Sequence, residues 1–160
     1  FAFENKALAS TPHYLDFKLI LNQSDAGKKA QKYLKNKLDN GLKNIRDKQK
    51  KILEEEKKLI QQKKVLSNED YKSKVTELRS KVSSLQKERN SLMQSVAKQR
   101  SKAKSELLKN LNPIVKNFMK ENKIRMVIDK KSILLADENL DITKDIMKAL
   151  NLKLKSVNLN

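Results

Sequence analysis

Two stretches of this chain repeat apolar residues at intervals of seven, and this spacing restricts the fold more than any other feature. In the first stretch five positions carry the repeat: Leu38, Ile45, Ile52, Leu59 and Leu66. In the second, apolar residues alternate spacings of three and four, interrupted only at Arg89 and Gln99: Tyr71, Val75, Leu78, Val82, Leu85, Leu92, Val96 and Ala103. Heptad spacing of this kind predicts two helices that pack along a narrow seam.

The link between the two stretches is short, which predicts an antiparallel helical hairpin with its tip at about residues 65–70. Ser67 is placed to cap the second helix, with Asp70 three residues later, where a capping box has an acid. We expect the first helix over residues 26–64 and the second to about Asn122. Pro113 lies inside the second helix and is expected to bend it.

The remaining residues, 1–25 and 124–160, predict a small β-rich head. Apolar residues alternate with polar ones at Leu15–Leu21 and at Ile124–Asp129, and the apolar run SILLAD follows at Ser132–Asp137. We expect short strands at these three places, the last two forming a hairpin. Thr143 is predicted to cap a final helix that runs to about Leu150. The fold class is therefore mainly α with a small β head, α+β, in which residues 26–123 form a hairpin that projects from the head.

So few short strands leave open sheet edges, which favour pairing with another copy of the chain. A head of this size is also marginally stable alone, because it has neither a disulfide nor a metal. We therefore expect self-assembly through the head.

Positive charge is concentrated on the two predicted helices. Of the net charge of +18, nearly all falls in residues 26–123, which carry 28 basic and 11 acidic side chains. Such a field attracts polyanions, membrane surfaces or acidic proteins and weakens with salt. Three interpretations remain open: a solvated coiled-coil surface, non-specific binding of nucleic acid through its phosphates, and capture of unfolded protein.

We find no arrangement of residues typical of an enzyme or of a cofactor site. Gly27-Lys28 is similar to part of a phosphate-binding loop, but the earlier glycine and the following Ser or Thr are missing, so it predicts a helix start. The acidic residues between Asp129 and Asp145 match no calcium loop. His13 is the only histidine and cysteine is absent, so no metal site is expected.

Three segments in order resemble the Skp (OmpH-like) family of periplasmic chaperones. They are YLDFKLILNQSDAGKKAQKYL at Tyr14–Leu34, VLSNEDYKSK at Val65–Lys74, and IRMVIDKKSILLADENLDITKDIMKALN at Ile124–Asn151. The resemblance implies a homotrimer whose heads join into a small barrel, with three hairpins around a cavity. It also implies a holdase that acts without ATP on unfolded outer-membrane β-barrel proteins in the periplasm, with a signal peptide that has been removed from this sequence or omitted from it.

The family pattern makes Phe17–Gln23 partly helical, in conflict with the strand that alternation predicts there. Past Asn151 the chain adds LKLKSVNLN, which we expect to form either a frayed tail or, less favoured, an edge strand. Contact with anionic lipid or lipopolysaccharide remains open.

Two groups of residues follow as candidates. For client contact on the hairpin we predict Leu53, Ile60, Val65, Leu66, Tyr71, Leu92 and Met93, with Lys57, Lys58, Lys63, Lys64 and Lys72 as the charged partners. For trimerisation we predict Met126, Val127, Ile128, Ile133, Leu134, Leu135, Ile142 and Ile146. The alternative role of the apolar hairpin residues is packing within the hairpin itself.

Overall fold

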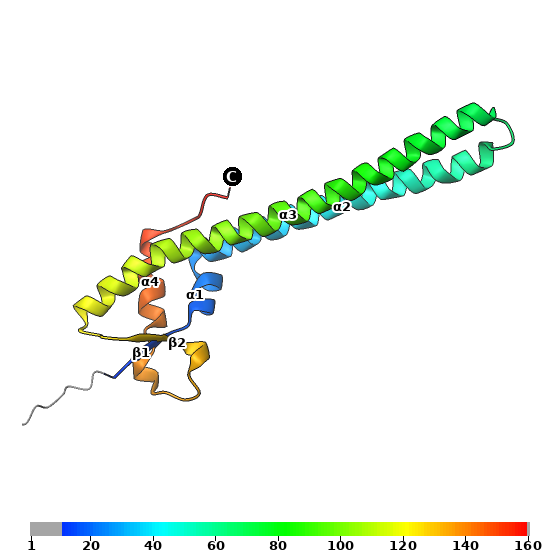
Figure 1. Cartoon of the computed structure of the whole chain (residues 1–160). Coiled ribbons are helices and arrows are strands. Elements are labelled where there is room, and N and C mark those ends of the chain that lie inside the picture. Colours follow the sequence, from blue (N-terminus) through cyan, green and yellow to red (C-terminus); the bar gives the residue numbers. More distant parts are fainter. Residues whose placement is uncertain (1–10, 160) are drawn as a thin grey trace, which may run out of the picture. The chain divides into compact units, whose positions relative to one another are not determined.

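The computed structural model describes residues 11–159, which form two compact units. The head unit comprises residues 11–32 and 101–159, and the hairpin unit comprises residues 33–100. The elements follow one another as β1 (His13–Leu15), α1 (Phe17–Gln23), α2 (Asp25–Gln62), α3 (Asn68–Glu121), β2 (Val127–Asp129), the 3-10 turns η1 (Lys130–Ser132) and η2 (Glu138–Leu140), and α4 (Thr143–Lys153) (Figure 1). The head unit therefore includes the first residues of α2 and the last part of α3, which sequence analysis assigned to the hairpin.

The hairpin unit confirms the antiparallel pair that the heptads predict (Figure 1). Its seam buries a short series of apolar side chains: Leu34, Ile45, Leu59 and Val96. Ser67 caps α3 as expected, because its hydroxyl accepts a hydrogen bond from the backbone N–H of Asp70 at 3.1 Å. The polypeptide thus reverses within five residues.

The junction between α1 and α2 explains why a glycine stands at position 27. Ser24 ends α1 and caps α2, and its buried hydroxyl accepts the Gly27 N–H at 3.2 Å. A Cβ at Gly27 would lie 2.1 Å from the carbonyl oxygen of Leu21, so no larger residue fits without moving the backbone. The Gly-Lys pair is a helix start, as expected.

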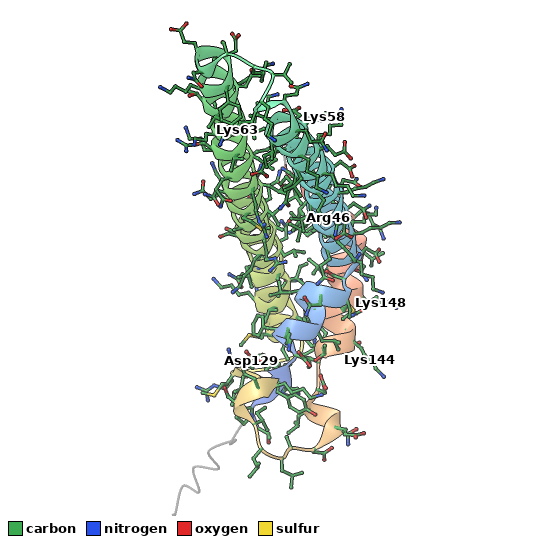
Figure 2. All side chains as sticks on the ribbon, turned by 90° about the vertical axis from the view of Figure 1, so that its right-hand side faces the viewer. Arg46, Lys58, Lys63, Asp129, Lys144 and Lys148 are labelled. Carbon is green, nitrogen blue, oxygen red and sulfur yellow. The ribbon has the colours of Figure 1, made fainter. Side chains whose placement is uncertain are left out.

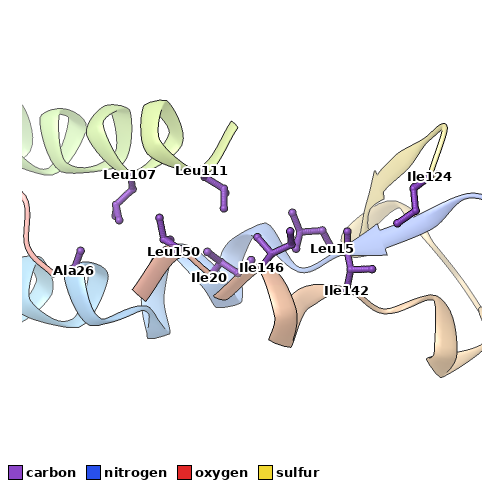
Figure 3. Close-up of a cluster of buried hydrophobic side chains, with 9 residues drawn as sticks. All are labelled: Leu15, Ile20, Ala26, Leu107, Leu111, Ile124, Ile142, Ile146 and Leu150. Carbon is purple, nitrogen blue, oxygen red and sulfur yellow. The ribbon is translucent and has the colours of Figure 1, made fainter. Parts of the chain in front are cut away.

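A single apolar core holds the head unit together (Figure 3). It is built from β1, α1, the start of α2, the end of α3, the segment leading into β2, and α4. Its buried members are Leu15, Ile20, Ala26, Leu107, Leu111, Ile124, Ile142, Ile146 and Leu150. Segments from both ends of the sequence therefore share one core.

Hydrogen bonds at Asp141–Thr143 fix the start of α4 to β1. The Ile142 N–H donates to the Tyr14 carbonyl at 3.0 Å, and the Asp16 N–H donates to the Thr143 hydroxyl at 2.9 Å. The Asp141 carboxylate in turn accepts the Thr143 N–H at 2.9 Å and the Thr143 hydroxyl. Partial burial raises the pKa of Asp141, but the Thr143 hydrogen bonds and the charge of Lys130 outweigh it and leave the pKa lowered.

The strand expected over Leu15–Leu21 is wrong beyond its first residue. Phe17–Gln23 is helical, as the family pattern implies, because the Asp16 carboxylate caps it by accepting the Leu19 N–H at 2.8 Å. Ile20 is fully buried on the helix face that meets the core, with Phe17 and Leu21 packed beside it. The apolar residues of this segment also recur at helical spacings of three and four, and its conformation follows that spacing rather than the strand-like alternation.

The expected strand hairpin after Ile124 is also wrong. Within residues 11–159 the sheet has two strands, and β2 pairs in parallel with β1, His13 opposite Val127. Residues 133–137 form no strand, since the Asp129 side chain accepts the Lys131 N–H and starts the turn η1. Without a partner strand, the apolar run that follows this turn gains no ladder hydrogen bonds.

Two details of the last segment differ from expectation. Thr143 is the first residue of α4 rather than its cap, because Ile142 occupies the cap position and the Asp141 carboxylate supplies the capping acceptor. The helix continues to Lys153, beyond the expected end at Leu150. Residues 154–159 are neither an edge strand nor a frayed tail: they leave α4 without regular structure, and Leu159 is buried.

The lowered pKa of Asp141 predicts a pH dependence of folding. Its carboxylate contributes stability that is present above the unfolded pKa of about 3.9 and is lost as pH falls through the lower folded pKa. We expect Asp141→Asn to cost about 1–2 kcal/mol at pH 7 and much less at pH 2, by urea denaturation. Asp145→Asn, which changes an exposed acid in the first turn of α4, is the control and should change stability by less than about 0.5 kcal/mol. Equal losses at both pH values for Asp141→Asn would contradict this role.

Candidate binding surfaces

The hairpin unit exposes large apolar side chains near its tip. Val65 is 86% exposed and Ile60 is 60% exposed, and Leu53 and Met93 are also exposed further along the helices. Leu66 and Tyr71 are half-buried at the turn. The structure thus places most of the predicted client-contact residues where another molecule can reach them.

Leu92 is the member of that group that belongs to the seam. It is half-buried and lies against Gly41, where an added Cβ would come within 2.5 Å of its methyl group. Packing within the hairpin therefore accounts for Leu92. Val82 shows the opposite: the heptads assign it to the seam, but it is more than half exposed, because two helices alone leave part of their apolar stripes uncovered.

Lysines surround the exposed apolar residues. The five predicted lysines are all exposed: Lys57, Lys58, Lys63, Lys64 and Lys72. Figure 2 labels Lys58 and Lys63 close to the hairpin tip. The Lys63 ammonium lies 5.8 Å from the ring centre of Tyr71, within range of a cation–π contact. Cationic and apolar groups are therefore interleaved on this surface.

Ion pairs do not neutralise the hairpin unit, which holds 19 basic and nine acidic side chains. Lys48 pairs with Glu88 and Lys81 with Glu55, each at 2.7 Å across the two helices. The hydrogen bond that the Lys81 ammonium donates to Glu55 raises the pKa of Lys81. These pairs are solvent-exposed and contribute little to stability, and they leave most of the positive charge of the hairpin unit unpaired.

The head unit has its own exposed apolar residues. Leu134 and Leu135 are almost completely exposed in the loop between η1 and η2, and Met126 is more than half exposed beside β2. Val127, Ile128 and Ile133 are half-buried. A hollow of about 500 Å³ lies under this loop, lined by Tyr14 and Lys130 among others. Three of the eight predicted trimerisation residues are therefore exposed to a partner: Met126, Leu134 and Leu135.

Ile142 and Ile146 are placed differently from the other predicted trimerisation residues. Both are buried in the core of one chain, where Ile146 has no exposed surface. They support the head from within and offer no surface to a second copy.

Sequence reasoning missed two exposed apolar residues of the head unit, Leu19 on α1 and Leu152 on α4. Each is a single leucine whose exposure no local pattern signals. In residues 11–159 no three His, Asp or Glu side chains are grouped so that they could hold a metal ion. Nor does any helix in that range combine the length and apolarity needed to cross a bilayer.

Comparison with known proteins gives consistent matches. The family model for the outer membrane protein (OmpH-like) group matches residues 13–150. A crystal structure of a candidate outer membrane chaperone (OmpH-like) from Caulobacter crescentus CB15 superposes with a TM-score of 0.85 at 19% identity. That alignment covers 99% of this chain and 95% of the other, so the two share a fold. No curated protein matches this sequence significantly.

Two neighbouring residues near the hairpin tip, Leu59 and Ile60, allow a packing role to be distinguished from a binding role. Leu59 is 7% exposed and Ile60 is 60% exposed, although both are apolar and adjacent. We expect Leu59→Ala to lower stability by about 2–3 kcal/mol, and Ile60→Ala to change it by less than about 0.5 kcal/mol. Thermal denaturation followed by circular dichroism measures both. A comparable loss for Ile60→Ala would mean that this side chain packs within the hairpin and is not free to bind a partner.

Proposed function

The chain belongs to the OmpH-like family of outer membrane proteins, and from this premise we propose that it is an ATP-independent holdase. Its clients are unfolded outer-membrane β-barrel proteins, which it keeps from aggregating in the periplasm. It is not an enzyme and needs no cofactor. The observation that carries the proposal is the hairpin tip, where Ile60 and Val65 are exposed among lysines.

The chemistry of the clients fits this surface. A barrel strand has alternating apolar residues and, before it is paired, free backbone N–H and C=O groups, so an unfolded barrel protein aggregates in water. Scattered apolar side chains on the hairpin offer many weak contacts without selecting one client structure. The net positive charge of the hairpin unit attracts acidic segments over distances of about a Debye length, and salt weakens this attraction.

Assembly as a homotrimer allows weak contacts between the hairpins and one client to add up to useful affinity. Leu134, Leu135 and Met126 are exposed on the head unit, and the outer edge of β2 has no partner strand in residues 11–159, so a second copy can pair with it. The outer edge of β1 already bonds to the segment at Asp141 and Ile142. Three hairpins held by one platform present their contacts at high effective concentration, so their affinities for one client combine. Release is passive, because a client that folds into the membrane no longer exposes the surface that the hairpins bind.

An aggregation assay tests the proposal. An outer-membrane barrel protein is diluted from urea, and light scattering is followed with and without this chain. We expect suppression of scattering that ATP does not change and that declines as salt is raised. The double variant Ile60→Ser with Val65→Ser should suppress scattering several-fold less well, because it removes apolar contact at the tip and leaves the charge intact.

Leu152→Ser is the matched control, since it removes a comparably exposed leucine from the head unit. It should act as the wild type does. A chain that leaves the client to aggregate would refute the holdase. If duplex DNA binds tightly and unfolded protein does not displace it, the alternative of a polyanion-binding coiled coil replaces it.

A further inference from the structure

The seam of the hairpin unit is not filled along its whole length. A hollow of about 380 Å³, here called the seam hollow, lies between α2 and α3. The two apolar residues that line it, Ile52 and Leu85, are half-buried members of the heptads and so form its base. Ser80 and Ser84 line it from α3, and their small side chains leave the space open. The hairpin unit therefore has an apolar recess in addition to its exposed apolar side chains.

Ion pairs across the two helices flank the seam hollow. Lys48 meets Glu88 and, one heptad along, Glu55 meets Lys81, each at 2.7 Å, while Lys81 also lies 3.4 Å from Glu77. Three lysines and three glutamates line the hollow, so their charges cancel, although the hairpin unit as a whole holds 19 basic and nine acidic side chains. An acidic ligand would face these three carboxylates, so the hollow suits an uncharged apolar group.

We propose that the seam hollow is a client-binding subsite, which takes one large apolar side chain from an extended segment of the client. The inference rests on the proposed function, because the ligand belongs to the same unfolded barrel proteins. It deepens that function, since it adds a recess that buries a client side chain to the exposed contacts at the tip.

The two serines are spaced to meet an extended backbone. Four residues of an α-helix span about 6 Å, and two residues of an extended strand span about 6.6 Å. Ser80 and Ser84 are exposed, so each hydroxyl can donate and accept a hydrogen bond. Apolar and polar residues alternate along a barrel strand, so one apolar side chain enters the hollow while its two neighbours point away.

The seam hollow continues toward the hairpin tip. A second hollow of about 260 Å³ adjoins it, and Glu55, Glu77 and Lys81 line both. This second hollow extends to Gln62, the last residue of α2, and to Lys74 in the first two turns of α3. A client segment bound at the tip therefore has a groove that leads to the seam hollow.

Salt separates this contact from the attraction between charges. At an ionic strength of about 1 M the Debye length is about 3 Å, so the attraction of the lysines for acidic client segments is screened. Burial of an apolar side chain does not depend on charge. At high salt the seam hollow therefore supplies a larger share of the affinity for the client.

Filling the hollow tests the proposal. Ser84→Leu places a leucine side chain beside Ile52 and Leu85, and Ser80→Leu fills the hollow from the preceding turn. The matched control is Ser83→Leu, which adds the same side chain at an exposed position that does not line the hollow. A fluorescently labelled, urea-unfolded outer-membrane barrel protein is titrated with each full chain in about 1 M NaCl. Anisotropy gives the dissociation constant, and urea denaturation followed by circular dichroism gives the stability.

We expect both filled variants to bind the client at least about three-fold more weakly than the wild type, and the control to bind no more weakly. Burial of one large apolar side chain is worth about tenfold to a hundredfold in affinity, and the other hairpin contacts dilute its loss. The filled variants should be at least as stable to urea as the wild type, because the added leucine buries apolar surface.

Folded filled variants that bind as tightly as the wild type would overturn the subsite and leave the holdase intact. Equal weakening by the control would also overturn it, since the loss would not depend on the hollow. If neither filled variant folds, the hollow has no room for an apolar side chain and the subsite is refuted. A wild-type chain that binds no client would instead refute the proposed function.

Discussion

The hydrogen bonds around Asp141–Thr143 join parts of the chain that are 127 positions apart, and the head unit depends on them. Tyr14 and Asp16 at the end of β1 meet Ile142 and Thr143 at the start of α4. At the other end of α4, the Asn151 side chain accepts the Asp25 N–H at 2.8 Å and so holds the first residue of α2. Helix α4 thus ties the beginning of the first long helix to the strand that precedes it.

The hairpin unit follows a different physical constraint. Two helices alone bury only a narrow seam, and a heptad stripe wider than that seam leaves apolar side chains in water. Ile60 and Val82 are the result, whereas Val65 is exposed in the turn between α2 and α3. In a structural coiled coil such residues would be a liability, but they are what an unselective binding surface requires. Exposed lysines surround these residues, and in the proposed function their charge attracts acidic client segments.

Periodicity predicted the long helices and their turn because few structures besides packed helices place apolar residues at intervals of seven. The head was harder to predict, since its short segments are decided by single capping groups and by contacts distant in sequence. Phe17–Leu21 alternates like a strand, but the Asp16 carboxylate and the burial of Ile20 make it a helix. The run after η1 has the composition of a strand, yet lacks a partner in one chain. No local sequence pattern predicts that Val157 packs against the core or that Leu159 is buried.

The central claim is that the head brings copies together and that the hairpins then share one client. Native mass spectrometry tests it most directly, on the chain alone and after mixing with an outer-membrane barrel protein diluted from urea. The account predicts a homotrimer that becomes a complex of three chains with one unfolded client. A chain that remains monomeric or dimeric in both samples would contradict it, because the account requires three hairpins on one platform around one client.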